Sequence, residues 1–364
     1  MIIPAVSYLA GAFVLVLFGT RNGRALLRDN FMNTMRTCAL KIPYSIRLVI
    51  FRMCFNLPLP ITKRILEVLT APQGIQKTYI QQKNISSLTT AHWIGSGVAN
   101  LPLAEVESTA ADQDLIVMLI HGGGFTVGNS TMYMSTMTAM LKRMKERHNR
   151  NARILSVDYP LALTHPYPHA PNACFEAYQY LVHTLSVSPS RIIIMGDSAG
   201  GNMVANLLLR LCEQRRDPSL PPLPQPAGGV MVSPWVTLHD DSPTYITNKK
   251  YDISTGPQLN HHVSYYLPDD LTRKEMLNNP LVSPVLGSYT DVVCPLLVTY
   301  SDHELFQYDA MRFVERARQD NVKVDVICRQ HQPHVWIMEP MVSTTLDVWQ
   351  EDVAKVTDWI VGCI

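Results

Sequence analysis

The chain has 364 residues, of which 47% are hydrophobic, so it is long enough to bury a large core and is not an intrinsically disordered protein. Charged residues make up only 17%, against about 25% in an average soluble protein. The 31 basic and 30 acidic side chains nearly cancel, which excludes a nucleic-acid binder that relies on net charge.

The first twenty residues contain no charged side chain, and three arginines follow at once. A helix rises about 1.5 Å per residue, so this stretch is long enough to cross a hydrocarbon core of about 30 Å. We expect residues 1–20 to form a membrane anchor, with the endoplasmic reticulum as the membrane; a buried or interfacial helix is the alternative. The arginines favour a cytosolic position for the rest of the chain, whereas the sequons at Asn84 and Asn129 matter only in a lumen, so both topologies stay open.

Residues 21–110 are expected to form a basic, amphipathic region that belongs to a cap and leads into the first strands. Eleven basic side chains lie between residues 21 and 83, where only Asp29 and Glu67 oppose them. Because short apolar runs lie between these charges, the region suits helices that rest on an anionic membrane or line an apolar entrance. A solvated basic face on a soluble cap is the alternative.

From residue 111 onward, short apolar runs alternate with helical stretches. Near-continuous apolar strands separated by helices are typical of a mostly parallel sheet covered on both faces. We therefore predict an α/β fold with a catalytic core over 111–364, interrupted by a cap insertion at about 215–270. The expected strands are 115–120, 153–159, 191–196, 229–233, 295–300 and 322–328, and the expected helices are 199–213, 306–319 and 346–361.

A serine flanked by glycines, in the segment GDSAG (196–200), lies at an expected strand-to-helix junction. A serine hydroxyl becomes an effective nucleophile when a sharp turn projects it toward a general base and toward backbone N–H groups. Gly196 and Gly200 lack a Cβ atom, so strand and helix can approach each other there. The pattern predicts that Ser198 is the nucleophile.

Three consecutive glycines follow the first of the core strands, in the segment HGGGF (121–125). Glycines leave the backbone uncovered, so N–H groups can point into a site and meet a negatively charged oxygen. The segment lacks the Lys-Ser/Thr pair of a phosphate-binding P-loop. An HGGG segment upstream of GxSxG is the combination of an oxyanion loop with a nucleophile turn.

With these two motifs, residues 114–362 resemble the hormone-sensitive-lipase-like branch of the α/β hydrolases, the group that includes arylacetamide deacetylases and fungal steryl acetyl hydrolases. One departure is the pair Leu163-Thr164, where relatives usually have Pro-Glu. The resemblance implies an α/β-hydrolase fold with a helical cap, no cofactor, and hydrolysis of carboxylic esters or amides of hydrophobic alcohols. Further family-like pieces are residues 157–162, 167–168, 233–235, 283–287 and 334–336.

The resemblance also implies the oxyanion hole and the base. The oxyanion donors would be the N–H groups of Gly123, Gly124 and Ala199, in and after the motif that begins with His121 and Gly122.

The base is expected beyond the last core strand, because the acid and then the histidine follow the serine along the chain. His331 is the rival of His334, and an HxxH pair could also bind a metal, but no third ligand with matching spacing is visible, so no metal is predicted. The family pattern of Pro-His-aromatic selects His334.

The acid is harder to choose, since two carboxylates follow the strand 295–300. A gapless register with relatives selects Glu304, with Asp309 as the downstream acid, whereas Asp302 lies two residues early. Either carboxylate can orient the imidazole of the base. Glu304 is the expected acid and Asp302 its rival.

The function expected from these residues is that of a serine hydrolase acting on a small hydrophobic ester, such as a steryl ester, a lipid or a lipophilic secondary metabolite. The membrane, reached through residues 1–20, is the second expected partner; no nucleic acid is expected. Acyl transfer or cyclisation on the same scaffold is the alternative, because it differs only in the exclusion of water. A non-catalytic ligand receptor, like the related plant gibberellin receptors that lack the histidine, is a remote alternative.

Overall fold

The structure is a computed structural model that describes residues 34, 36–217, 219 and 223–364. The expected membrane anchor, residues 1–20, lies outside this part of the chain. Among the described residues, none of the helices has the length and apolar character needed to cross a bilayer.

An eight-stranded sheet forms the centre of the molecule, with the strand order β1-β2-β4-β3-β5-β6-β7-β8. The pairs β1–β2 and β2–β4 are antiparallel, and the other five pairs are parallel. The prediction of a mostly parallel sheet flanked by helices is therefore confirmed. The strands are β1 (Ile80–Asn84), β2 (Thr90–Ile94), β3 (Leu115–Ile120), β4 (Ala152–Asp158), β5 (Ile192–Asp197), β6 (Gly228–Val232), β7 (Leu296–Ser301) and β8 (Val324–Arg329).

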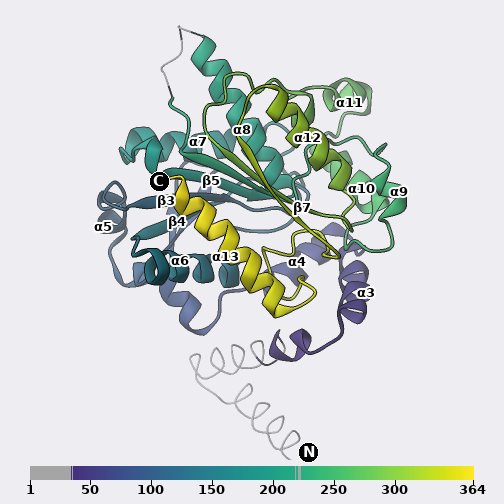
Figure 1. The fold of residues 1–364 in the computed structure, drawn as a ribbon, viewed down its shortest axis with the longest axis horizontal. Helices are drawn as coiled ribbons and strands as arrows, with labels where there is room; N and C mark the ends of the chain where they lie inside the picture. The colour runs from purple at the N-terminus through teal and green to yellow at the C-terminus, as the bar shows by residue number, and fades with distance from the viewer. Residues whose placement is uncertain (1–33, 35, 218, 220–222) are drawn as a thin grey trace, which may run out of the picture.

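Helices cover both faces of this sheet (Figure 1). Helices α6 and α13 pack together on one face, while α7, α8 and α12 lie on the other. The helices are α3 (Tyr44–Phe55), α4 (Leu59–Leu69), α5 (Leu103–Ser108), α6 (Met134–His148), α7 (His169–Gln179), α8 (Ala199–Arg216), α9 (Thr244–Thr247), α10 (Gly256–Tyr266), α11 (Asp270–Leu277), α12 (Gln307–Gln319) and α13 (Leu346–Gly362). Short 3₁₀ or π segments occupy Gly74–Tyr79, Val98–Asn100, Tyr180–Thr184, Pro189–Arg191 and Pro284–Leu286.

The apolar strands divide their side chains between two cores. In β3, Ile116 and Met118 belong to the core under α8, whereas Leu115 and Val117 belong to the core under α6 and α13. The division follows from the pleat, because successive side chains of a strand point to opposite faces. Every residue of β3, β5 and β6 is buried, which is why these strands lack polar alternation. Burying one aliphatic side chain stabilises the folded state by about 1.5–3 kcal/mol.

A cap covers one end of this sheet. It is built from α3 and α4, which precede the sheet in the chain, and from α9, α10 and α11, which lie between β6 and β7. The expected insertion at 215–270 therefore contains the core strand β6 as well as cap helices. Arg47, although charged, is only 4% exposed, and its guanidinium replaces lost hydration by donating hydrogen bonds to the carbonyl oxygens of Ser343 (3.0 Å) and Thr344 (2.9 Å). These bonds fasten α3 to the segment between β8 and α13.

Candidate active site

Ser198 lies at the sharp turn between β5 and α8. Its backbone has φ 51° and ψ −117°, a conformation that costs energy for a residue with a side chain. A Cβ atom added to Gly196 would collide with the Gly200 carbonyl, and one added to Gly200 would collide with the Ile120 carbonyl. The two glycines thus permit the close strand-to-helix approach that holds the serine in its strained position.

The glycine segment after β3 lies beside this turn. Gly123 (φ 101°) and Gly124 (φ 59°) take conformations that favour glycine, and both line the cavity that Ser198 lines. The N–H group of Gly122 points elsewhere, since it donates to Asp197 Oδ1 at 2.9 Å. Ala199 begins α8 directly after the serine, where a helix N-terminus favours negative charge. The structure thus brings the expected oxyanion donors together around Ser198.

His334 is buried in the loop after β8. Its Nδ1 lies 3.4 Å from Oε2 of Glu304, and its ring meets that of Phe306 edge-on at a centroid distance of 4.9 Å. Burial lowers the pKa of His334, while the negative charges of Asp252 and Asp197 oppose this shift. A lowered pKa keeps the imidazole neutral near pH 7, which is the form that accepts a proton.

Glu304 is fully buried behind His334. Its Oε1 accepts hydrogen bonds from the Ser233 hydroxyl (2.8 Å) and the Ser301 N–H group (3.1 Å), which leaves Oε2 for the imidazole. Burial raises the pKa of Glu304, and these two donors counteract the shift. The Ser233 hydroxyl also accepts the N–H group of Val335 at 3.1 Å, so it ties the acid to the loop of the histidine.

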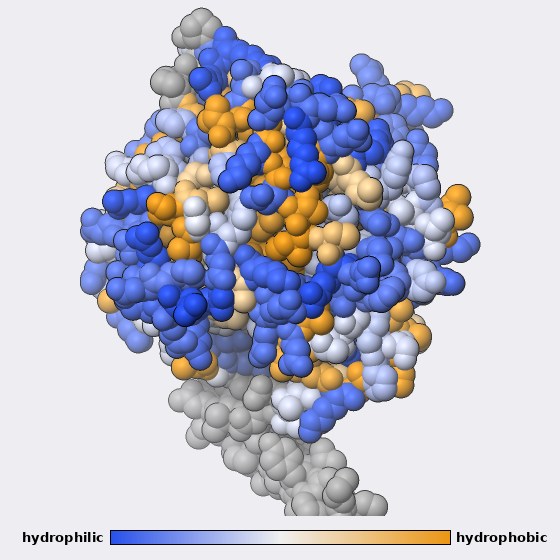
Figure 2. Space-filling view, in the orientation of Figure 1, coloured by the Kyte–Doolittle hydropathy of each residue, from blue (hydrophilic) through white to orange (hydrophobic). Residues whose placement is uncertain are grey.

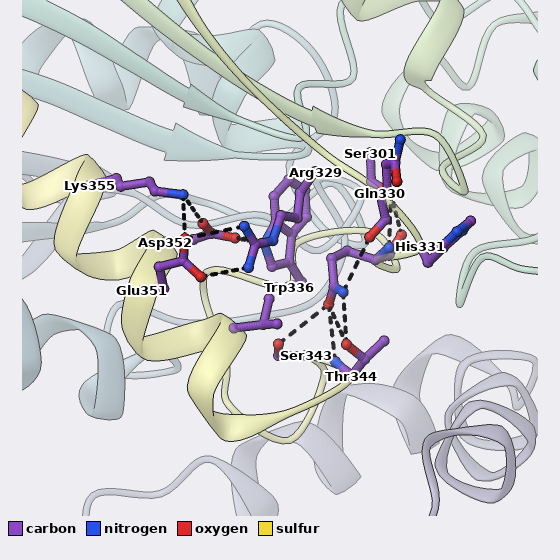
Figure 3. A network of polar contacts seen from close by, with 12 residues as sticks. Ser301, Arg329, Gln330, His331, Trp336, Ser343, Thr344, Glu351, Asp352 and Lys355 are labelled. Atoms are coloured by element: carbon purple, nitrogen blue, oxygen red, sulfur yellow. Dashed lines mark hydrogen bonds and ion pairs between the residues drawn. The ribbon is translucent and has the colours of Figure 1, made fainter.

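Asp302, the rival acid, faces a different histidine. Its Oδ1 accepts the N–H group of His331 at 2.6 Å, and its Oδ2 lies 3.8 Å from His331 Nδ1. Figure 3 shows a polar network that joins Ser301 to Ser343 and Thr344 through Gln332, with His331 at its edge. His331 itself has a side chain that is 70% exposed. Of the two rival histidines, only His334 lines the cavity, and Glu304 is the carboxylate that contacts it from behind.

Asp252 is a buried carboxylate that no sequence motif singled out. Its Oδ1 accepts the N–H groups of His334 (3.2 Å) and Ser254 (3.3 Å), and its Oδ2 accepts the N–H group of Leu305 (2.7 Å). It therefore links the loop of the acid to the loop of the histidine. The sequence could not reveal it, because Asp252 lies far from the catalytic motifs in the chain. Its role depends on contacts between loops that form only on folding.

Asp197 lies inside the GDSAG motif, but the motif alone predicts no separate role for it. Its carboxylate accepts the Gly122 N–H group and, at 2.6 Å, the hydroxyl of Tyr133. Burial raises the pKa of Asp197 to about 6, although both donors oppose the shift. This carboxylate fixes the glycine segment against the nucleophile turn.

The cavity in front of Ser198 is mostly apolar. Its volume is about 170 Å³, similar to an engineered cavity of about 150 Å³ that binds benzene. Helices α3 and α4 form its outer wall, and His262 of α10 lies against Gly124. Burial lowers the pKa of His262 to about 4, so this ring is neutral. The lining residues of α3 and α4 are Ile50, Phe51, Cys54, Phe55, Thr62, Ile65, Leu66 and Leu69, and Thr70 follows directly after α4.

One group of side chains has the donor set of a metal site. The ligand atoms of Asp302, His303 and His331 all lie within 4.8 Å of one another. No third ligand is visible near His331 and His334 in the sequence, because folding brings His331 to His303 and Asp302, which lie 28 and 29 positions away. The prediction of no metal depended on the lack of a third ligand, and in the structure Asp302 and His303 lie beside His331.

Comparisons with known proteins agree with this architecture. Residues 117–338 match the sequence profile of a family described as having the α/β-hydrolase fold. An esterase of Acinetobacter venetianus is 35% identical over 221 residues, which cover 60% of this chain and 66% of that protein. A hormone-sensitive lipase of Bos taurus is 37% identical over 98 residues, which cover 26% of this chain and 12% of the lipase. The chain aligns with less than two thirds of the length of either relative.

The fold matches solved structures over most of their length. The crystal structure of an esterase from the bacterial hormone-sensitive lipase family has a TM-score of 0.71 and 23% identity, covering 88% of this chain and 98% of that one. A second structure, the hormone-sensitive-lipase homologue EstE7 from a metagenome library, has a TM-score of 0.70 and 23% identity, with 88% and 99% coverage. The chain therefore belongs to the α/β-hydrolase fold family that its motifs predicted, and its fold matches those of esterases from the bacterial hormone-sensitive lipase family.

Proposed function

We propose that this protein is a serine hydrolase that cleaves carboxylic esters of hydrophobic alcohols, with Ser198, His334 and Glu304 as its triad. One observation carries the proposal: a serine on a strained turn, a glycine segment and a buried histidine all border a single apolar cavity, and the buried Glu304 contacts that histidine from behind. In an ester hydrolase, these parts supply the nucleophile, the oxyanion donors, the base and its orienting acid.

The reaction follows from these positions. Ser198 Oγ attacks the ester carbonyl carbon while Nε2 of His334 takes the hydroxyl proton, and Glu304 holds the other nitrogen and stabilises the imidazolium. The N–H groups of Gly123, Gly124 and Ala199 receive the negative charge of the tetrahedral oxygen. His334 then gives its proton to the leaving alcohol, and a water molecule, activated in the same way, releases the acid from Ser198.

The apolar cavity favours a substrate with a short acyl group on a bulky hydrophobic alcohol. A cavity of about 170 Å³ has room for a short chain or one ring, and its wall of α3 and α4 lies toward the solvent. Steryl esters, acylglycerols and esterified lipophilic metabolites are the proposed classes.

The outer surface of the cap favours the proposal that the substrate comes from a membrane. Large apolar side chains on α3 and α4 are exposed, and Figure 2 shows hydrophobic colour at the lower right, where Figure 1 places α3. Lys63 and Arg64 lie between them in the sequence, and only two acidic residues stand among the eleven basic ones of segment 21–83. Apolar residues flanked by basic ones bind an anionic bilayer. The exposed apolar residues of α3 and α4 that do not line the cavity are Ile46 (52%), Val49 (56%), Met53 (68%), Ile61 (50%) and Val68 (47%).

We propose that this face rests on an anionic bilayer, with residues 1–20 as a further anchor and the endoplasmic reticulum as the membrane. An ester dissolved in the bilayer would then enter between α3 and α4 and reach Ser198 without crossing water.

The decisive experiment treats the full chain with a fluorophosphonate and a panel of steryl, glyceryl and aryl esters, beside the S198A variant. Labelling and hydrolysis by the wild type alone support the proposal. Ester products formed with an added alcohol in place of free acid would indicate acyl transfer, and a protein that takes no label would be a receptor.

A further inference from the structure

The loops that carry Glu304 and His334 meet a second time, outside the cavity. Asp302 and His303 follow β7, and His331 follows β8, so the parallel pairing of these strands brings the three side chains to the same edge of the sheet. Nδ1 of His331 lies 3.0 Å from Nε2 of His303 and 3.8 Å from Oδ2 of Asp302. Among the residues that the structure describes, no other His, Cys, Asp or Glu side chains form such a group of three.

We propose that Asp302, His303 and His331 form a binding site for a divalent transition metal of the zinc class, which joins the two catalytic loops. In a tetrahedral zinc site with Zn–N distances of about 2.0–2.1 Å, two nitrogen ligands lie about 3.3 Å apart. The 3.0 Å contact between the imidazoles is within a few tenths of an ångström of that value. Two imidazoles and one carboxylate leave a fourth position for water.

The three ligands are held in place before any metal arrives. The ring of His303 stacks on Tyr251 with a centroid distance of 4.2 Å and an interplanar angle of 11°. His331 has a left-handed backbone (φ 57°), and its N–H group donates to Oδ1 of Asp302, so the carboxylate keeps its other oxygen for a metal. Ordered ligands reduce the entropy lost on binding.

Access and charge also suit a cation. The side chain of His331 is 70% exposed and that of Asp302 33% exposed, and Figure 3 shows the His331 ring pointing away from the polar network behind it. The nitrogen-rich set favours zinc, nickel or copper over magnesium.

Zinc bound here would fasten together the segments that hold Glu304, two residues after Asp302, and His334, three residues after His331. A ligand that binds only the folded chain raises its melting temperature, and a rise of about 3 °C or more is expected at zinc concentrations of about 100 times Kd. The site does not depend on the proposed hydrolysis, because the metal touches neither Ser198 nor the cavity.

The test uses the full chain, stripped with a chelator and dialysed, in calorimetric titrations with ZnCl₂ and in thermal melts. We expect one zinc ion per chain, no comparable binding of Mg²⁺, and at least about a tenfold loss of affinity in H303A and H331A. H261A removes an exposed histidine elsewhere and should bind like the wild type. S198A should also bind zinc normally, which separates this site from the proposed function.

Two results would overturn the proposal: a wild type that binds no more zinc than H331A, or a H303A/H331A double variant that keeps the wild-type affinity. The second result would assign the zinc to exposed thiols such as Cys38 and Cys328. Because His331 is mostly exposed, H331A should fold, and D302N provides a conservative third variant whose circular dichroism can be compared.

Discussion

His334 Nδ1 lies 3.4 Å from Glu304 Oε2, although the two residues are 30 positions apart in the chain. The reason is topological: Glu304 follows β7, His334 follows β8, and these strands are parallel neighbours whose carboxyl ends share one edge of the sheet. Ser233, after β6, joins them through its hydroxyl. Three consecutive strands of the sheet thus contribute to one buried polar cluster.

Replacing Ser198 by alanine should lower kcat for a short-chain p-nitrophenyl ester at least about 10³-fold, because the nucleophile is lost while the oxyanion donors remain. Fluorophosphonate labelling should disappear as well. S288A, at an exposed serine, is the matched control and should keep the wild-type rate and label. A wild-type rate in S198A would remove the serine mechanism.

Substitutions of the two rival acids should have different effects on kcat. Glu304→Gln should reduce kcat by about 10²–10⁴-fold, because an amide cannot stabilise the imidazolium or hold its tautomer. Asp302→Asn should change kcat less than about threefold, since Asp302 contacts His331 instead. Steady-state kinetics of both variants decide between them, and the reverse order of effects would transfer the role to Asp302.

The pH–rate profile should have its acidic limb below the ordinary histidine pKa of about 6.5. Burial lowers the pKa of His334, so protonation, which removes the base, takes place only at a lower pH. kcat/KM should therefore be almost unchanged from pH 7.5 to pH 6.5 and decline as the pH falls further. A midpoint above pH 7 would show that the negative charges of Asp252 and Asp197 outweigh burial.

Gly124→Ala should abolish most of the activity, because the new Cβ would collide with the ring of His262 and the backbone (φ 59°) disfavours a side chain. The loss of one oxyanion donor lowers kcat about 10²–10³-fold. Gly97→Ala is the control: Gly97 also has a positive φ (72°), but its Cβ would meet nothing within 4 Å. It should lower stability slightly and leave kcat unchanged, and equal losses in the two variants would mean that backbone strain alone is responsible.

The proposed bilayer contact predicts that Val49→Glu combined with Met53→Glu weakens binding to phosphatidylserine-containing vesicles at least about tenfold, since each apolar side chain contributes about 1.5–3 kcal/mol when buried. Neither residue lines the cavity, so hydrolysis of a soluble ester should persist. Leu271→Glu, at a residue of α11 that is 93% exposed, is the matched control and should not change vesicle binding. Cosedimentation with vesicles measures the binding of the wild type and both variants. If the double variant binds as well as the wild type, this face is not the bilayer contact.

Local patterns were sufficient for the parallel part of the sheet and for half of the site. The six apolar runs predicted β3 to β8 with ends within two residues of those observed, because a strand covered on both faces has to be apolar throughout. Ser198 and the segment 121–125 were recognisable because a tight turn and an uncovered backbone require particular residues at fixed spacing. The strained φ of Ser198 and the positive φ of Gly123 and Gly124 agree with those requirements.

Tertiary structure decided which side chains meet. Glu304 and Asp302 have similar chemistry and lie two positions apart, so their roles depend on the direction in which each leaves the loop after β7, toward His334 or toward His331. Asp252 and the partnership of His303 with His331 arise only when loops distant in the chain converge. A sequence records the requirements of a strand or a turn locally, whereas contacts between loops depend on how parallel strands align their ends.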